Sequence, residues 1–242
     1  MTVVAFQMYI LNWYEKHKRD YLPWRPSASS GQVDPYHILV SEIMLQQTQV
    51  SRVLQKYPEF LKAFPTIQSL KNASLRTILK VWQGMGYNRR ALYLQKIAKA
   101  VAGECNGVIP SDPEELQKLS GIGSYTAGAI ACFAFGKPIA FLDSNIRKVY
   151  VYHFFYDRRK SDTKIDDREI LELAKKALYK QDPRKWHYAL MDYGAVALVR
   201  EKGVLDRVKA YHRQSSFLDS TRYFRSKIVR HLLRYKTSAN LN

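Results

Sequence analysis

The 242-residue sequence has little of three things: cysteine, acidic side chains and long apolar runs. Its two cysteines, Cys105 and Cys132, are too few for a disulfide framework, a four-cysteine zinc site or a four-cysteine iron–sulfur site. We expect both to be small core residues and expect no metal site.

The sequence also lacks membrane and export signals. No apolar run approaches the roughly 18 residues that a helix needs to cross a bilayer. Residues 1–12 have neither the basic start nor the small-residue cleavage site of a signal peptide. We therefore expect a soluble, cytoplasmic protein that does not enter a membrane.

Acidic residues are outnumbered, because 39 Lys and Arg residues stand against 21 Asp and Glu residues, for a formal net charge of +18. The apolar content of 46% is typical of a globular protein. Like charges repel one another across a compact chain, so the excess favours an anionic partner. Nucleic acid is the first candidate and an acidic membrane surface is the second.

What the sequence does contain is helical periodicity. Asp34-Pro35 is typical of an N-cap followed by proline at the first helical position. Residues 113–118 and 124–135 are predicted to be helices. The apolar run 150–155 could be a strand, but we interpret it as helix because it follows a helical stretch from Asn145. The sequence thus predicts an all-α protein.

The tail from Arg200 is strongly basic, with eleven Lys and Arg residues and three acids. Basic and apolar residues alternate from Arg222 to Leu233, which predicts an amphipathic helix. We expect this helix to bury Phe224 and Leu232 and to offer its other face to phosphate. A merely solvated helix would share the spacing but not the bias in sign.

Leu119-Ser120-Gly121-Ile122-Gly123 lies between the two predicted helices 113–118 and 124–135. Its glycines permit a tight turn that exposes backbone amides at the start of the next helix, where they bind phosphate without reading sequence. This is the helix-hairpin-helix pattern. Alone it is a weak signal, because many helix–turn–helix connections contain Gly-x-Gly.

Two carboxylates are candidates for chemistry. Asp143 follows the hairpin by twenty residues, with apolar neighbours that desolvate it and a following helix that keeps it ionised. Glu42 lies upstream among Ile43, Met44 and Leu45. Together they could serve as an anion and an acid. Each also has a plainer interpretation, Asp143 as an N-cap and Glu42 as a solvent-facing helix residue.

These motifs occur in the order found in one family. Ser41-Glu42-Ile43-Met44-Leu45-Gln46-Gln47-Thr48-Gln49-Val50 resembles the signature of the MutY-type adenine DNA glycosylases, within the helix-hairpin-helix (endonuclease III-like) superfamily. The hairpin and four further segments are similar to that family in the same order: Leu22-Pro23-Trp24-Arg25, Gly84-Met85-Gly86-Tyr87, Leu142-Asp143-Ser144-Asn145 and Met191-Asp192-Tyr193-Gly194-Ala195. The resemblance covers about residues 5–200.

The resemblance implies a role for each matching residue. Glu42 matches the general acid that protonates adenine, and Asp143 matches the carboxylate that stabilises or captures the sugar cation, with Asn145 nearby. Tyr125 stands where lyase-active relatives have lysine; a tyrosine cannot form a Schiff base, so the enzyme is expected to be monofunctional. DNA contacts are implied at Leu45, Gln46, Gln47, Thr48, Met85, Tyr87, Gly121 and Gly123, and an adenine pocket at Trp24, Arg25 and Asp192. Among the DNA contacts, Leu45, Gln46, Gln47 and Tyr87 match residues that wedge into the duplex.

The sequence departs from the family in several places. Leu198 occupies the position of the first of four cluster cysteines and no cysteine follows, so we expect the iron–sulfur cluster to be absent and no cofactor to be needed. We also expect the C-terminal domain that reads 8-oxoguanine to be missing. Ser120, Ser144 and Asn88 stand where proline, glycine and a second tyrosine are usual.

The resemblance implies a two-lobed helix-hairpin-helix glycosylase fold with a DNA cleft between the lobes. We expect a six-helix lobe at residues 25–135 and a second lobe from residues 1–24 and 136–242, whose basic tail replaces the cluster segment. The expected function is excision, by a monomer, of a mispaired base from duplex DNA, most simply adenine opposite 8-oxoguanine or guanine.

Two alternatives stay open. One is a thymine or uracil mismatch glycosylase, because such relatives also have tyrosine at position 125; the segment Gln46-Gln47-Thr48 favours adenine. The other is a catalytically inactive DNA-binding module, against which the presence of both Glu42 and Asp143 argues.

Overall fold

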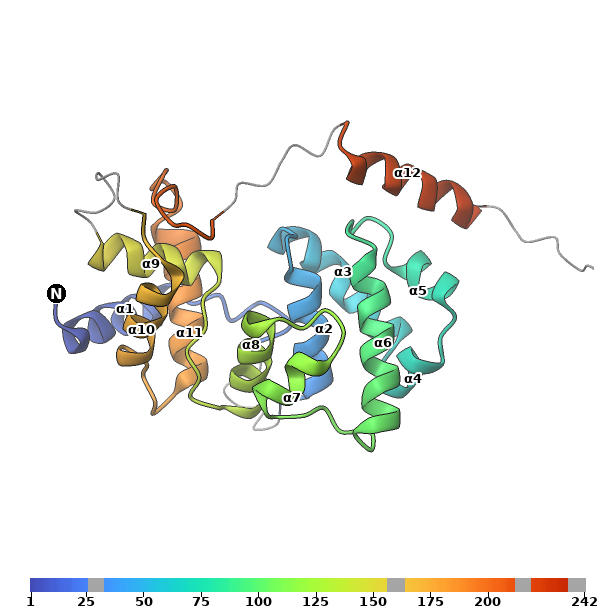
Figure 1. Ribbon diagram of the computed structural model, residues 1–242, viewed down its shortest axis with the longest axis horizontal. Coiled ribbons are helices and arrows are strands. Elements are labelled where there is room, and N and C mark those ends of the chain that lie inside the picture. The colour runs from blue at the N-terminus through green and yellow to red at the C-terminus, as the bar shows by residue number, and fades with distance from the viewer. Residues whose placement is uncertain (26–32, 156–163, 212–218, 235–242) are drawn as a thin grey trace, which may run out of the picture. The chain divides into compact units, whose positions relative to one another are not determined.

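The computed structural model describes residues 1–25, 33–155, 164–211 and 219–234. These residues form helices and no named β-strand, with an isolated parallel bridge between Ile165 and Val208 (Figure 1). The all-α prediction is confirmed. The predicted helix over the apolar run 150–155 is also confirmed, since it forms the end of α9.

In the described residues the elements follow the order α1 (Val3–His17), α2 (Pro35–Leu45), α3 (Val50–Ala63), α4 (Ile67–Asn72), α5 (Leu75–Val81), α6 (Arg89–Glu104), α7 (Pro113–Lys118), α8 (Ser124–Phe135), α9 (Ser144–Phe154), α10 (Asp167–Lys176), α11 (Pro183–Asp192), the π-helix η2 (Tyr193–Ala197) and α12 (Thr221–Arg234). None of these helices has the length and apolar content that a bilayer crossing requires.

The helices belong to two compact units. Unit 1 consists of Met1–Val33, Ser111–Pro113 and Gly123–Arg213, and unit 2 of Asp34–Pro110, Glu114–Ile122 and Gln214–Asn242. The structure thus places α8 in unit 1 and α12 in unit 2, whereas the sequence-based division put α8 in the 25–135 lobe and the tail in the other.

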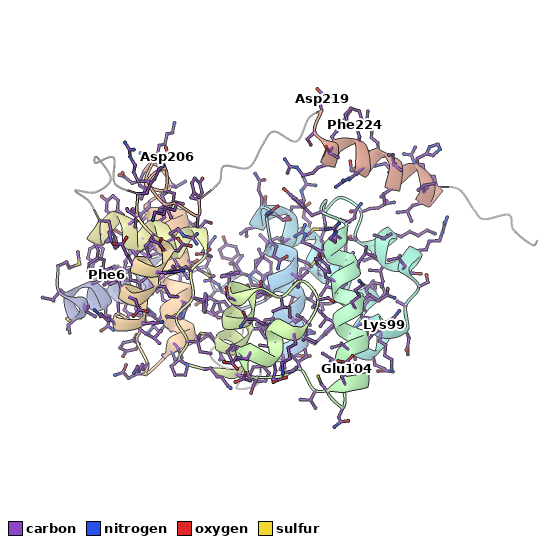
Figure 2. The ribbon with its side chains drawn as sticks, viewed as in Figure 1. Phe6, Lys99, Glu104, Asp206, Asp219 and Phe224 are labelled. Atoms are coloured by element: carbon purple, nitrogen blue, oxygen red, sulfur yellow. The ribbon has the colours of Figure 1, made fainter. Side chains whose placement is uncertain are left out.

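Aromatic packing builds the core of unit 1 and explains the place of α8. Phe6 of α1 is fully buried, 4.9 Å from the ring of Phe154 and 5.7 Å from that of Trp186 (Figure 2). Residues 126–134 of α8 are all buried, and Phe133 stacks on Tyr188 of α11 at 4.5 Å. A helix that is apolar on every side needs partners all round, and α11 supplies one of them.

Unit 2 is built around α2, α3 and α6. As predicted, Asp34 caps α2 by accepting a hydrogen bond from the Tyr36 amide at 2.8 Å, and Pro35 opens the helix. The buried face of α3 includes Phe60, whose ring lies 5.8 Å from that of Trp82 at the end of α5. α2 packs against both α3 and α6, and the glutamine motif begins at its C-terminal end.

The basic tail is divided between the units. Val204, Leu205 and Val208 are buried in unit 1, whereas α12 contacts α5 of unit 2 (Figure 1). Residues 212–218 and 235–242 of the predicted tail lie outside the described residues.

The predicted burial of Phe224 and Leu232 is wrong. Phe224, near the start of α12 in Figure 2, is 53% exposed, and Leu232 is 61% exposed. Leu233 is buried instead, and its carbonyl accepts a hydrogen bond from Arg76 Nη2 of α5 at 3.1 Å. The helix carries apolar residues around much of its circumference, and it docks through the face that contains Leu233.

Candidate active site

Asp143 is the N-cap of α9 and its carboxyl group is held by two hydrogen bonds. Oδ1 accepts a hydrogen bond from the Ile146 amide at 2.6 Å, and Oδ2 accepts one from Asn145 Nδ2 at 3.1 Å. The residue as a whole is half-buried. This burial raises the pKa of Asp143 above its ordinary value of 3.8, while the two hydrogen bonds and the charge of Arg147 act in the opposite direction. The structure therefore brings Asp143 and Asn145 together in a desolvated, hydrogen-bonded site.

Gly194 allows the segment after Asp192 to approach the backbone of Asn145 closely. A Cβ atom at Gly194 would lie 2.5 Å from the backbone oxygen of Asn145, a distance that real side chains do not tolerate. Gly194 lies in the π-helix η2. π-helices are rare in proteins overall, but those that occur are often found at functional sites. The glycine thus lets η2 pack directly against the start of α9.

The adenine-pocket candidates form a buried ion-pair cluster. Arg25 Nη1 and Nη2 each donate to one oxygen of Asp192 at 2.7 Å, and Arg19 donates to the same carboxylate through Nε at 2.6 Å and its amide at 3.0 Å. Asp192 is fully buried, Arg25 is buried, and the Arg25 guanidinium lies 4.4 Å from the centre of the Tyr188 ring. Trp24 next to Arg25 is also buried.

This cluster changes the interpretation of Asp192 and adds Arg19 to the site. Asp192 accepts four hydrogen bonds from protein donors, which suits a carboxylate that orients Arg25 better than one that reads a base. Sequence reasoning missed Arg19 as a member. The signal that it offered was its position next to Asp20 near the Trp24-Arg25 motif, which does not distinguish it from a surface arginine.

Glu42 is buried in α2, at 5% exposure, and so is its neighbour Ser41. The plainer interpretation of Glu42, a helix residue facing solvent, is therefore wrong. Glu42 belongs to unit 2, whereas Asp143 belongs to unit 1.

Two turns of unit 2 carry the residues predicted to wedge into a duplex. The first follows α2 and contains Gln47, with φ 53°; the second precedes α6 and contains Tyr87, with φ 46°. Both are non-glycine residues in the left-handed region, a strained conformation that is concentrated at binding and catalytic sites. Leu45 and Gln46 are partly exposed at the first turn, and Met85 is buried in the second.

One side chain that sequence reasoning missed joins these turns. Arg90, at the start of α6, is 5% exposed and donates to Gln46 O, Thr48 Oγ1 and Gly86 O among others. Burial lowers the pKa of Arg90 to about 10, so the guanidinium stays charged at neutral pH. Its acceptors are mostly backbone carbonyls, which leave no pattern in a sequence.

The hairpin glycines have different local roles. Gly121 has φ 81°, and a Cβ atom there would lie 2.3 Å from the ring of Tyr93, so both its conformation and its space require glycine. Gly123 is the N-cap of α8 and, as a glycine, supplies no side-chain cap to that helix end. Tyr125 lies in the first turn of α8, its ring 5.7 Å from that of Phe141.

Comparison with known families identifies this set of motifs. Residues 40–177 match the model of the HhH-GPD superfamily base excision DNA repair proteins, a span that contains Glu42, the hairpin, Tyr125, Asp143 and Asn145. The chain belongs to the HhH-GPD superfamily.

Relatives of this HhH-GPD chain include three proteins named adenine DNA glycosylase. The one from Buchnera aphidicola subsp. Baizongia pistaciae is 37% identical over 83% of this chain and 55% of the relative, and that from Mycobacterium tuberculosis is 38% identical over 77% of this chain and 59% of the relative. The human protein is 37% identical over 83% of this chain and 37% of its own length. The chain thus spans little more than half of these relatives' length, or less.

Solved structures share the HhH-GPD fold. A thermostable thymine-DNA glycosylase superposes with a TM-score of 0.69 at 28% identity, over 80% of this chain and 86% of the other. An endonuclease III in a non-covalent complex with DNA superposes with a TM-score of 0.65 at 18% identity, over 86% of this chain and 96% of the other. The predicted helix-hairpin-helix glycosylase fold is confirmed.

The cysteines of this HhH-GPD chain do not fit a four-cysteine cluster. Cys132 is buried in α8 with its sulfur 3.5 Å from His187 Nδ1, and Cys105 ends α6 in the other unit. Leu198, at the position of the first cluster cysteine, is buried. Across the described ranges, no group of three or more His, Cys, Asp or Glu side chains is arranged to hold a metal ion.

Proposed function

We propose that the protein is a monofunctional DNA glycosylase of base excision repair that removes adenine mispaired with 8-oxoguanine or guanine. The observation that carries the proposal is the Asp143 carboxylate, held by Asn145 and the start of α9 in a chain similar to adenine DNA glycosylases. The net charge of +18 supports duplex DNA as the partner. We place the activity in the cytoplasm, with the chain acting as a monomer.

In the proposed reaction, Glu42 donates a proton to the adenine ring and the glycosidic bond breaks, with its electron pair going to the leaving nitrogen. Protonation lets the base leave neutral, which lowers the barrier. Asp143 faces the sugar cation that develops at C1′ and stabilises it or bonds to it. Water then supplies the hydroxyl group at C1′ and releases a proton, so the products are free adenine and an abasic sugar.

A thymine or uracil mismatch activity is the second candidate, because a thymine-DNA glycosylase is among the structural neighbours at 28% identity. Tyr125 fits either substrate, since both reactions are monofunctional when no amine is present. The sequence Gln46-Gln47-Thr48 at the turn after α2 favours adenine as the excised base, because it is similar to the motif of the adenine glycosylases.

A panel of duplexes tests the proposal. Each duplex carries one A:8-oxoguanine, A:G, T:G, U:G or A:T pair, and strand cleavage is measured under single-turnover conditions with and without alkali. We expect alkali-dependent cleavage at adenine in the first two duplexes and none without alkali. Cleavage at thymine or uracil would support the second candidate, cleavage without alkali would contradict monofunctional chemistry, and no cleavage would leave the inactive binding module.

We also propose that the chain works without an iron–sulfur cluster. The support is the donor set, since two cysteines in different units cannot supply four thiolates to one cluster. The purified protein should be colourless and iron-free, and a chelator should leave its melting temperature unchanged. Stoichiometric iron in protein purified without added metal would overturn this proposal.

A further inference from the structure

Arg90 has an unusual set of partners for a buried cation. Nη1 donates to the carbonyls of Ile43, Met44 and Gln46 at 3.0, 2.7 and 2.5 Å. Nη2 donates to Thr48 Oγ1 at 2.8 Å and to the carbonyls of Met85 and Gly86 at 3.2 Å each. Two terminal nitrogens carry four hydrogens, so some of these six bonds are shared.

The acceptors belong to two turns that are far apart in sequence. Gln46 and Thr48 flank Gln47, and Gly86 immediately precedes Tyr87. These two flanked residues are predicted wedge residues, and both have left-handed backbones, at φ 53° and 46°. Arg90 therefore holds the backbone carbonyl before Gln47, the side-chain hydroxyl after it, and the backbone carbonyl immediately before Tyr87.

The ring of Tyr87 is fixed by the same group. Arg90 Cζ lies 5.4 Å from the centre of the Tyr87 ring and 5.3 Å from that of Trp82, and Trp82 Nε1 donates to Gly86 O at 3.0 Å. On α12, Arg222 Cζ lies 5.3 Å from the Tyr87 ring, and its Nη1 donates to the Tyr87 hydroxyl. Two guanidinium groups thus contact one wedge aromatic.

We propose that Arg90 is a positioning residue that locks the Gln47 and Tyr87 turns together in their strained conformations. Both predicted wedge residues are then already in position when a duplex binds. The role in base extrusion rests on the proposed function, but the locking itself does not. A preformed pair of turns would not have to be ordered during binding, which leaves more of the binding free energy for opening the base pair.

A guanidinium suits this role and an ammonium does not. Its planar fork directs donors to acceptors on two sides at once, whereas lysine presents three donors at a single point. Arg90→Lys keeps the positive charge and removes the fork, and Arg90→Met removes both. Arg89→Met is the matched control, because Arg89 is the preceding residue of α6 and is exposed.

Amide hydrogen exchange in the DNA-free protein tests the locking. The Thr48 amide donates to Leu45 O and the Met85 amide donates to Trp82 O, so each reports one turn. In Arg90→Lys and Arg90→Met we expect exchange to rise at least tenfold at both amides, with the α3 core amides unchanged. In Arg89→Met we expect changes under twofold. Unchanged exchange in the Arg90 variants, or a rise at one turn alone, would overturn the proposal.

Thr48→Val keeps the test decisive if the Arg90 variants do not fold. It removes one acceptor of Nη2 and retains the side-chain shape, and we expect it to raise exchange at the distant Met85 amide as well as at position 48. A rise confined to position 48 would contradict the coupling of the two turns.

A fluorescence measurement separates this proposal from the proposed function. 2-Aminopurine placed beside an A:8-oxoguanine pair brightens when the stack opens. We expect Arg90→Lys to slow opening at least tenfold relative to Arg89→Met, with equal affinity for an undamaged duplex. If the native protein opens the pair and Arg90→Lys matches it, the positioning role fails. If the native protein opens no pair, the proposed function fails and hydrogen exchange still decides the locking.

Discussion

Two buried arginines hold the candidate site residues of the two units, and their charges are balanced in different ways. In unit 1, Arg25 makes a two-point ion pair with Asp192, which Arg19 also contacts. In unit 2, Arg90 is held by carbonyl oxygens and a hydroxyl, three of those carbonyls lying at the C-terminal end of α2. A helix C-terminus carries partial negative charge and unpaired carbonyls, so it can bind a cation without a carboxylate.

The two arrangements fix different parts of the structure. A carboxylate and a guanidinium orient one another, so Asp192 determines how Arg25 lies over Tyr188. A guanidinium on carbonyls determines the course of the backbone, so Arg90 shapes the turns that contain Gln47 and Tyr87. Unit 1 thus positions a side chain, and unit 2 positions loops.

The largest effect on stability is expected from breaking the ion pair in unit 1. Arg25→Met leaves the fully buried Asp192 with Arg19 as its remaining cationic partner, and removal of one member of a buried pair costs about 3–5 kcal/mol. Urea unfolding measures the loss. Lys185→Met is the control, because its pair with Glu15 is partly exposed and should contribute under about 1 kcal/mol. Equal losses in the two variants would show that burial of the pair does not matter.

The next effect depends on pH and concerns the core of unit 1. The His187 ring stacks on that of Phe141 at 4.0 Å, and its Nδ1 donates to Pro183 O at 2.7 Å. Burial lowers the pKa of His187 from 6.5 to about 4. Between these values the unfolded chain binds a proton and the folded chain does not, so stability falls as pH is lowered from 6.5 to 4. The loss should approach about 3 kcal/mol.

Unfolding of His187→Gln along the same pH series checks this prediction. The variant should lose the His187 part of the pH dependence, whereas His17→Gln, at an exposed position of α1, should keep it. If native protein and His187→Gln show parallel curves from pH 6.5 to 4, the account of His187 is incorrect.

The smallest effect tests how α12 docks. Leu232 is 61% exposed and Leu233 is buried, so the two neighbours form a matched pair in one helix. Leu232→Ala should change the free energy of unfolding by less than about 0.5 kcal/mol, and Leu233→Ala should lower it by about 2 kcal/mol. Thermal unfolding of both variants gives the answer. A larger loss at Leu232 would mean that α12 docks through its other face.

Local patterns predicted the helices well. The hairpin helices 113–118 and 124–135 have the bounds expected from the sequence, and Asp34 caps α2 as expected, because caps and periodicity act within a few residues. The Asp143–Asn145 pair could also be predicted, since both partners lie in one short motif. The burial of Glu42 could not be predicted. Because α2 is apolar on most of its surface, the sequence pattern does not show which side of the helix is buried.

Features that depend on tertiary packing could not be predicted from the sequence. The assignment of α8 to unit 1 depends on α11, which lies about fifty residues further along the chain. The docked face of α12 was ambiguous because apolar residues occur on two sides of it. Arg90 was missed because five of its six acceptors are backbone carbonyls, which every residue possesses.

We propose that Asp143 stabilises the sugar cation, and single-turnover excision by Asp143→Asn measures this contribution. Asparagine is also a good N-cap, so the variant should keep α9 and the fold. On the duplex that the native protein cleaves, we predict a rate at least about 10³-fold lower with an affinity for that duplex within about twofold of native, because the anion acts on the transition state. Excision at a near-native rate by the folded variant would contradict the account.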